Sequence, residues 1–269
     1  MWEIIKYIIL GIIQGITEIL PISSSGHLVL FQELFNLKEP GLVFEMFTNM
    51  ASFLALTLLF YKDIIKLVKG FVLYIFKKEK EVYKEDFLYA IKLLIAIIPI
   101  GIFGLLFKDQ MASIKNLLTV GIALIVTGSL LLTIYFTRNT IKDHNEVTYK
   151  DAVIIGLVQS FAIFPGISRS GSTIIGGRSS KVSLQSILKF SFLAYILISI
   201  PTSALGIYDL TQTNASINFL GYSLAFVATF IFTFGTGYLV MKKLKVEHLI
   251  YFGIYCAIVG MVAVGFYLF

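Results

Sequence analysis

The chain has 269 residues, of which 57% are hydrophobic and only 14% are charged, whereas an ordinary soluble domain carries about 25% charged residues. Together with a mean hydropathy of +0.87, this composition excludes a disordered protein, a nucleic-acid-binding domain and a typical cytosolic enzyme, and it indicates an integral membrane protein. The net charge of +6 matters less than its distribution between loops, because lysine and arginine set the orientation of a membrane protein.

The first apolar stretch, Ile4–Leu20, contains Gln14 and Glu18 and runs into the polar sequence Pro-Ile-Ser-Ser-Ser-Gly-His at residues 21–27. A short apolar segment, Leu28–Phe35, follows it. We expect a re-entrant helical hairpin here, since a polar tip at membrane depth is tolerated only where protein or a wet cavity surrounds it.

Three stretches after this hairpin are long enough to cross a membrane, which takes about 20 mostly apolar residues. They are Val43–Tyr61, Phe87–Phe107 and Leu117–Phe136. The segment 62–86 between the first two is rich in both lysine and acidic residues. We expect it to be a solvated loop rather than a patch that binds anionic lipid.

The second half has the same layout. Ala152–Phe164 is too short to span the membrane and runs into Pro-Gly-Ile-Ser-Arg-Ser-Gly-Ser-Thr at residues 165–173, followed by a short segment, Ile174–Leu188. We expect a second re-entrant hairpin at this position. The remaining predicted spans are Phe190–Tyr208, Phe219–Val240 and Leu249–Phe269.

The positive charges predict the orientation of these segments. Most loop lysines and arginines fall on the side that receives the segment 62–86, and this bias makes that side cytoplasmic. Both termini and the mouth of the first hairpin then face outward, and the second hairpin enters from the cytoplasm.

The two hairpins resemble each other at a constant offset of 145 residues. Each is followed by three spans, an odd number, so the second unit begins on the opposite face of the membrane. We therefore predict an all-α polytopic membrane protein with one domain, residues 1–269. It contains two inverted-topology repeats, about 1–136 and 152–269, whose polar tips meet near the midplane. The aligned pairs include Gly11 with Gly156, Gln14 with Gln159, Ser23 with Ser168, Ser25 with Ser170 and Gly26 with Gly171.

Facing tips would bring together the Glu18 carboxylate, the His27 imidazole, the Arg169 guanidinium and many hydroxyls. Ionisable groups at membrane depth are costly and are therefore functional candidates. Arginine binds phosphate oxygens bidentately, and hydroxyls and helix-start N–H groups add further anion contacts. A serine beside a histidine is a candidate nucleophile with its base, and Glu18 is a candidate ligand for a divalent cation that bridges phosphate oxygens. The collection suits a phosphate.

Structural roles remain open for several of these residues. Glu18 and Arg169 could form a buried ion pair that only holds the hairpins together. Ser23 and Ser25 could be helix caps or helix-packing residues, and Glu45 could be an interfacial charge at the start of a span.

At these residues the chain resembles the undecaprenyl-diphosphate phosphatase family, of the bacitracin-resistance type, over essentially its whole length. The matching motifs are GIIQGITEILPISSSGH at residues 11–27 and FPGISRSGST at residues 164–173. The resemblance implies a bacterial cell-membrane enzyme that hydrolyses undecaprenyl diphosphate to undecaprenyl phosphate and inorganic phosphate. This reaction recycles the lipid carrier for cell-wall synthesis. The resemblance also implies a need for Mg²⁺ or Ca²⁺, two inverted repeats and a pocket open to the outer side.

The resemblance carries residue roles onto this chain. Ser24 matches the nucleophile and His27 its general base, with Glu18 and Arg169 completing the catalytic set. Many members have Glu where this chain has Gln14, so either Glu18 and Glu45 hold the metal or the metal arrives with the diphosphate. The residues that match the phosphate-binding motif are Ser168, Arg169, Ser170 and Thr173. We expect Ser23 and Ser25 to bind phosphate as well, and the residues expected near the metal are Gln14, Glu18 and Glu45.

The alternative function is transport, because inverted repeats with broken helices also occur in secondary transporters. Such a protein would carry or flip undecaprenyl phosphate or another anion. Ser24 and His27 discriminate between the two, since transport needs only a binding site whereas hydrolysis needs a nucleophile or an activated water. The expected partners are a polyprenyl diphosphate lipid and membrane lipids, with no nucleic acid, and a homodimer is left open.

Overall fold

The computed structural model describes residues 2–37, 43–76, 80–137, 144–212 and 218–268. Within these residues the regular secondary structure is helical, apart from one isolated bridge between His144 and Val182. The α-helices are α1 (Trp2–Thr17), α2 (Ser24–Leu34), α3 (Val43–Leu59), α4 (Tyr61–Phe76), α5 (Lys80–Ser113), α6 (Leu117–Thr137), α7 (Tyr149–Ser160), α8 (Arg169–Ser179), α9 (Leu184–Gln212), α10 (Phe219–Lys243) and α11 (Leu249–Leu268), with 3₁₀ turns η2 (Phe161–Ile163) and η3 (Val246–His248).

Five of the described helices are long and apolar enough to cross a membrane, namely α5, α6, α9, α10 and α11. The helices α3 and α4 reach that length only as a pair, and they are bent by 78° at their junction. The prediction of an all-helical, multi-pass membrane protein is therefore confirmed, with the first predicted span ending at a sharp bend.

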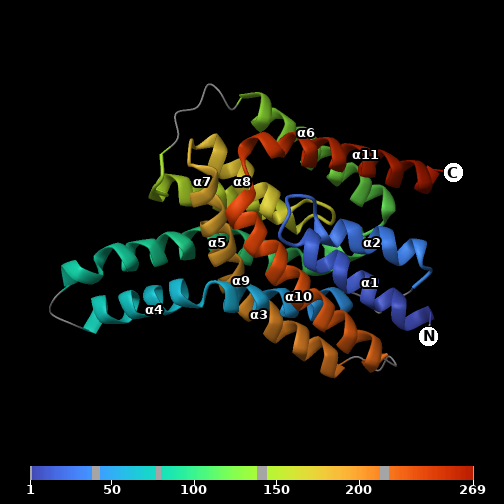
Figure 1. Ribbon diagram of the computed structural model, residues 1–269, viewed down its shortest axis with the longest axis horizontal. Helices are drawn as coiled ribbons and strands as arrows, with labels where there is room; N and C mark the ends of the chain where they lie inside the picture. Colours follow the sequence, from blue (N-terminus) through green and yellow to red (C-terminus); the bar gives the residue numbers. More distant parts are fainter. Residues whose placement is uncertain (1, 38–42, 77–79, 138–143, 213–217, 269) are drawn as a thin grey trace.

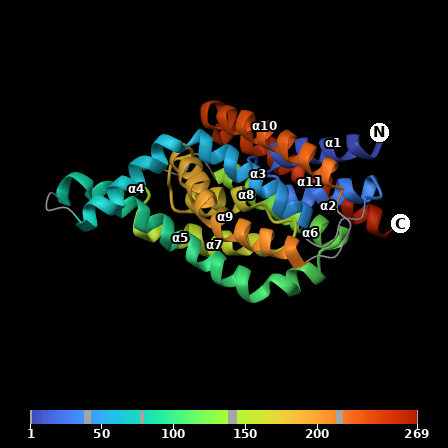
Figure 2. The ribbon, with the colours of Figure 1, turned by 90° about the horizontal axis from the view of Figure 1, so that it is seen from below.

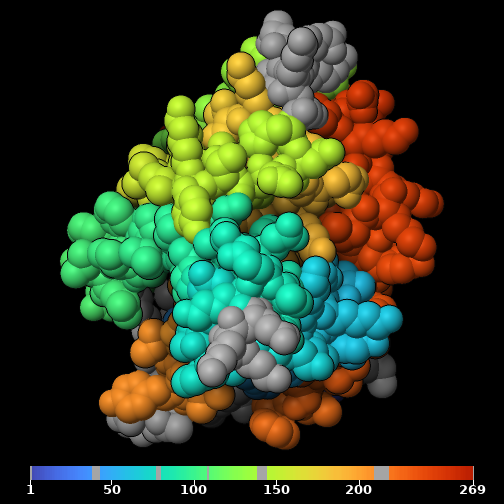
Figure 3. All heavy atoms as spheres, turned by 90° about the vertical axis from the view of Figure 1, so that its left-hand side faces the viewer, coloured from blue at the N-terminus to red at the C-terminus, as the bar shows by residue number. Residues whose placement is uncertain are grey.

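The prediction of a solvated loop at 62–86 is wrong. Most of this segment forms α4 and the beginning of α5, which extend side by side at the end of the molecule opposite the two termini (Figures 1 and 2). Apolar side chains at helical spacing lie between the lysines, and Tyr74 stacks on Phe87 with 4.2 Å between ring centroids. The space-filling view of this end shows α4 and the start of α5 in front (Figure 3). The charged residues of this segment therefore belong to a helical hairpin formed by α4 and the start of α5.

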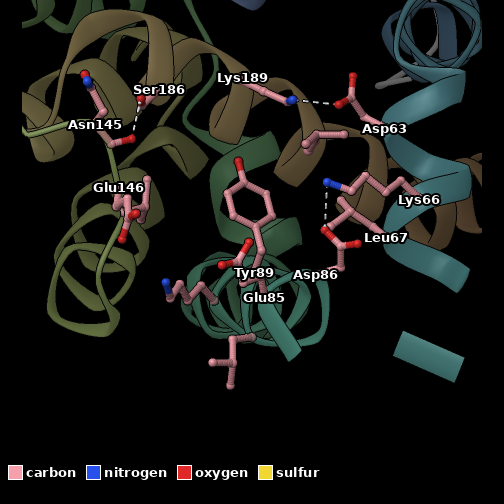
Figure 4. A pocket seen from close by; sticks show the side chains of 14 residues that line it. Asp63, Lys66, Leu67, Glu85, Asp86, Tyr89, Asn145, Glu146, Ser186 and Lys189 are labelled. Carbon is pink, nitrogen blue, oxygen red and sulfur yellow. Dashed lines mark hydrogen bonds and ion pairs between the residues drawn. The ribbon is translucent and has the colours of Figure 1, made fainter. Parts of the chain in front are cut away.

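Two ion pairs fasten α4 to its neighbours around a cavity of about 420 Å³. Lys66 on α4 pairs with Asp86 on α5 at 3.2 Å, and Lys189 on α9 pairs with Asp63 on α4 at 2.6 Å. Figure 4 shows both pairs on one side of Tyr89. These two ion pairs therefore join α4 to α5 and to α9 beside the cavity.

The segment predicted at Ile174–Leu188 is also divided differently. Helix α8 ends at Ser179 and α9 begins at Leu184, several residues before the predicted start of the span at Phe190. Lys181 has a positive φ of 66° and turns the chain between them. The long α9 results because Leu184 and Leu188 are buried in the main core and extend the apolar face towards the N-terminus of the helix.

Close helix contacts place the two hairpins inside the bundle. Gly11 of α1 packs against the backbone of Ala225 on α10, and Gly156 of α7 packs against the backbone of Ala96 on α5. Neither contact leaves room for a Cβ atom. The Thr229 hydroxyl also donates to the Gly11 carbonyl at 3.0 Å. The helices α3, α5 and α9 then surround the loops that follow α1 and α7.

Candidate active site

The starts of α2 and α8 have matching caps. The Ser23 hydroxyl accepts from the Gly26 N–H at 3.2 Å, and the Ser168 hydroxyl accepts from the Gly171 N–H at 3.0 Å. Both serines are nearly buried. Capping of this kind satisfies N–H groups that a helix start leaves without partners. Ser23 therefore caps α2, which is the structural role that the sequence left open, and Ser168 caps α8 in the same way.

The two caps open onto one cavity of about 460 Å³. Its polar end is lined by Glu18, Ser24, Ser25, Asn49 and Arg169, and its other end by apolar side chains of α5 and α9. Residues from both halves of the chain thus meet at one surface, as the facing tips predicted.

Glu18 is the centre of the polar end. Its two carboxylate oxygens accept from the Arg169 guanidinium and from the Ser24 hydroxyl, and the Gln14 amide adds a bond of 2.9 Å. The Glu18 side chain is only 5% exposed, whereas the Arg169 side chain is 26% exposed. A phosphate entering the cavity therefore reaches the guanidinium and the Ser24 hydroxyl more easily than it reaches the carboxylate.

Arg169 also contacts Tyr195, a residue that the sequence did not single out. The guanidinium carbon lies 3.9 Å from the ring centroid of Tyr195 on α9, a cation–π contact. The Tyr195 hydroxyl donates to the Asn49 carbonyl at 3.0 Å, and the Asn49 side-chain oxygen accepts from Gln14 at 2.6 Å. These contacts close a ring of interactions around the ion pair. Tyr195 lies inside a predicted span, and no local pattern distinguishes it from a packing aromatic.

His27 lies behind the serine loop. Its Nδ1 is 2.7 Å from the Ser23 carbonyl, and its Nε2 is 2.8 Å from the Tyr255 hydroxyl on α11. A carbonyl only accepts, so Nδ1 carries the proton and Tyr255 donates to Nε2. The imidazole also stacks on the Tyr255 ring. His27 is 2% exposed and is absent from the described residues that line the cavity. In this arrangement Ser24 bonds to Glu18 rather than to His27.

The remaining predicted residues lie in or near the cavity. Ser25 and Ser170 line the cavity, and the Ser170 hydroxyl donates to the Leu20 carbonyl at 2.9 Å. Thr173 is buried inside α8, where its hydroxyl bonds to the Ser170 carbonyl and to Ser191. Glu45 lies at the rim of the cavity and forms an ion pair with Lys115.

The donors near Glu18 suit a hard cation that brings other ligands with it. In the described part of the chain, no three His, Cys, Asp or Glu side chains converge as a preformed metal site. Gln14 Oε1 is buried and has no hydrogen-bond partner among the described residues. A carboxylate, an amide oxygen and a hydroxyl are ligands that Mg²⁺ and Ca²⁺ accept, and Mg²⁺ in particular takes few protein ligands together with substrate phosphates.

The fold and the site together define a polytopic membrane protein with a carboxylate, a guanidinium and a hydroxyl gathered inside its helical bundle. The chain belongs to the bacitracin resistance protein BacA family, whose model matches residues 7–262. The resemblance predicted from the two motifs is therefore confirmed.

Three relatives illustrate the similarity. An undecaprenyl-diphosphatase of Acholeplasma laidlawii is 48% identical over 99% of this chain and 98% of its own length. An undecaprenyl-diphosphatase of Oceanobacillus iheyensis is 39% identical over 98% of this chain and 97% of its own. The protein named undecaprenyl-diphosphatase 3 of Bacillus anthracis is 43% identical over 98% of each chain.

Proposed function

We infer that this chain hydrolyses undecaprenyl diphosphate to undecaprenyl phosphate and inorganic phosphate, and so recycles the lipid carrier of cell-wall synthesis. The relatives that cover its whole length carry the name of this activity. The observation that carries the inference is the contact of Glu18 with both Arg169 and Ser24 in one cavity. A guanidinium binds phosphate, and a hydroxyl that donates a hydrogen bond to a carboxylate is activated as a nucleophile.

The reaction follows from these contacts. Arg169 exchanges a carboxylate oxygen of Glu18 for oxygens of the terminal phosphate. The Ser24 oxygen attacks the terminal phosphorus, its proton passes to Glu18, and the bond to the bridging oxygen breaks. Undecaprenyl phosphate leaves, and water then cleaves the phosphoserine to release phosphate and restore Ser24. In a variant of this mechanism, Ser24 only binds the phosphate and water attacks directly.

The base role of His27 stays a prediction. In the present geometry Glu18 is the acceptor next to Ser24, and the His27 ring would have to leave Tyr255 to replace it. The contacts of His27 support a positioning role, because its Nδ1–H holds the carbonyl of Ser23, the residue that precedes Ser24.

A divalent cation, Mg²⁺ or Ca²⁺, belongs to this proposal. Among the described residues, the charged side chains that line this cavity and the smaller one beside it are Glu18, Glu45, Lys115 and Arg169, and their charges sum to zero. A diphosphate therefore adds negative charge that these residues do not neutralise. Glu18 would hold the cation, with Glu45 available when Lys115 releases it. Gln14 would join them through its oxygen only after its amide turns, because its nitrogen donates to Glu18 and Asn49. When bound, the cation supplies positive charge to the phosphate oxygens.

The apolar end of the cavity suits the polyprenyl tail. It lies between α5 and α9, where Gly101, Gly104, Ile198 and Leu205 line it. A Cβ atom at Gly104 would meet nothing within 4 Å. A gap between two long apolar helices lets the tail remain in the bilayer while the diphosphate reaches Arg169.

The inverted repeat and the re-entrant hairpins are part of the same proposal. Helices α2 and α8 have 11 residues each, a length of about 16 Å, whereas the hydrocarbon core is about 30 Å thick. At Gly11, α1 of the first half packs against α10 of the second half. At Gly156, α7 of the second half packs against α5 of the first half. Both observations support two related units whose hairpins enter the membrane without crossing it.

The orientation remains as the charges predict it, with both termini outside, lysine-rich segments cytoplasmic and the cavity open outward. The separation of the termini from the α4–α5 end supports this assignment (Figure 1).

The test is phosphate release from undecaprenyl diphosphate by the purified protein in detergent, with Mg²⁺, Ca²⁺ or EDTA. We expect release with a divalent cation and its loss in EDTA. A folded protein that releases no phosphate would contradict the proposal. Flux of undecaprenyl phosphate across proteoliposomes without hydrolysis would then favour the transporter.

A further inference from the structure

A second ion pair lies beside the Arg169–Glu18 pair. Lys115, in the turn between α5 and α6, contacts the Glu45 carboxylate in the first turn of α3. The two side chains are 15% and 20% exposed. They line a smaller cavity of about 180 Å³ that shares Ser25, Glu45 and Gly104 with the main one. The Lys115 ammonium is therefore at the edge of the same space that Arg169 enters.

Arg169 and Lys115 line two adjoining cavities that share Ser25 and Glu45. Glu45 and Asn49 lie one turn apart on α3, a rise of about 6 Å along the helix axis. Asn49 bonds to Gln14, and Gln14 bonds to Glu18, the partner of Arg169. A ligand with two adjacent phosphate groups carries negative charge for a cation in each of the two adjoining cavities.

We propose that Lys115 binds the phosphate that stays on the lipid, while Arg169 binds the terminal phosphate that is released. This inference rests on the proposed function and adds a substrate-binding residue to it. Lysine suits the role because its ammonium has three donors on a flexible stem. A phosphate oxygen would replace the Glu45 carboxylate as the partner of Lys115, so the largely buried ammonium would keep a negative partner. The competing interpretation is that Lys115 only fastens the α5–α6 turn to α3.

The experiment compares Lys115→Met, Lys115→Arg and a control, Lys6→Met. Lys6 bonds to the Phe35 carbonyl at 2.7 Å and is absent from the described residues that line either cavity. For each protein we would measure kcat and KM for undecaprenyl diphosphate. Equilibrium binding of undecaprenyl phosphate and inhibition by inorganic phosphate complete the set.

For Lys115→Met we expect KM and the Kd of undecaprenyl phosphate to rise by about tenfold or more, as for a lost charge-assisted hydrogen bond. Inhibition by inorganic phosphate should stay as in the wild type, because that phosphate binds at Arg169. Lys115→Arg should restore most of the lipid affinity, and Lys6→Met should match the wild type.

An unchanged Kd for undecaprenyl phosphate in Lys115→Met would overturn the proposal. So would a parallel change in lipid binding and in phosphate inhibition, which is the signature of a purely structural tie. A wild-type protein without phosphatase activity would contradict the proposed function instead, and the binding measurement would still test Lys115.

Discussion

The two hairpin tips have the same helix cap but differ in chemistry. Ser23 and Ser168 cap their helices in the same way, yet the next residue is Ser24 in the first hairpin and Arg169 in the second. The first tip also has Glu18 beside it, and the carboxylate joins the two. The same helix cap is therefore followed by a hydroxyl in one hairpin and by a guanidinium in the other, and both groups contact the single carboxylate of Glu18.

The tips also differ in their backbone. Ser23 has a positive φ of 69°, whereas the second loop has its positive φ of 93° at Gly166. A non-glycine residue in this region costs on the order of 1–3 kcal/mol and is typical of functional sites. His27 donates to the Ser23 carbonyl and helps to hold this conformation. The strained non-glycine residue therefore lies in the hairpin that carries Ser24.

The largest effect on activity is expected when the first tip loses the Ser24 hydroxyl. Ser24→Ala should lower kcat/KM for undecaprenyl diphosphate by about 10³-fold, because it removes the attacking oxygen. Phosphate release measures it, with Ser129→Ala on α6 as a control in which only a bond to the Ile125 carbonyl is lost. A loss smaller than about tenfold would favour direct attack by water.

Removing the cation of the second tip should have the next largest effect. Arg169→Ala should lower kcat/KM by about 10²-fold, as for a lost donor to developing negative charge. Arg169→Lys should recover only part of this, because an ammonium cannot bind bidentately. A folded Arg169→Ala protein with near-wild-type activity would remove Arg169 from the site.

Substitutions of His27 test whether the strained conformation of Ser23 matters for activity. His27→Ala should lower kcat by about tenfold through the loss of a positioning hydrogen bond. His27→Asn should retain most of the activity, because its amide can still donate to the Ser23 carbonyl. If the Asn and Ala variants are equally inactive, the imidazole is the base.

The smallest effect concerns the apolar side of the cavity, to which η2 of the second hairpin contributes Ala162 and Ile163. Gly104→Leu should raise KM for undecaprenyl diphosphate by about fivefold, since a leucine side chain would occupy the path of the tail. A short-chain prenyl diphosphate should be affected less. Gly235→Leu is the control, because a Cβ there also meets nothing within 4 Å. Equal KM values for both variants would place the tail elsewhere.

The sequence predicted the fold class and the polar cluster because both depend on local patterns. Long apolar runs identify spans, and the repeated Ser-x-Ser-Gly motif identifies both tips. Charged residues concealed the helical periodicity of α4, so 62–86 was assigned wrongly. Tyr195 and Tyr255 were missed because they meet Asn49 and His27 across 146 and 228 residues, and a single sequence contains no local signal for such contacts.

The central claim is that Glu18 of one hairpin and Arg169 of the other act on a single phosphate. The most direct test is a double-mutant cycle with Glu18→Gln and Arg169→Gln, measured as single-turnover phosphate release. Two groups acting in one transition state should be non-additive, so the double variant should lose about as much activity as the worse single variant. Losses that multiply in the double variant would mean that the two hairpins act independently and would contradict the account.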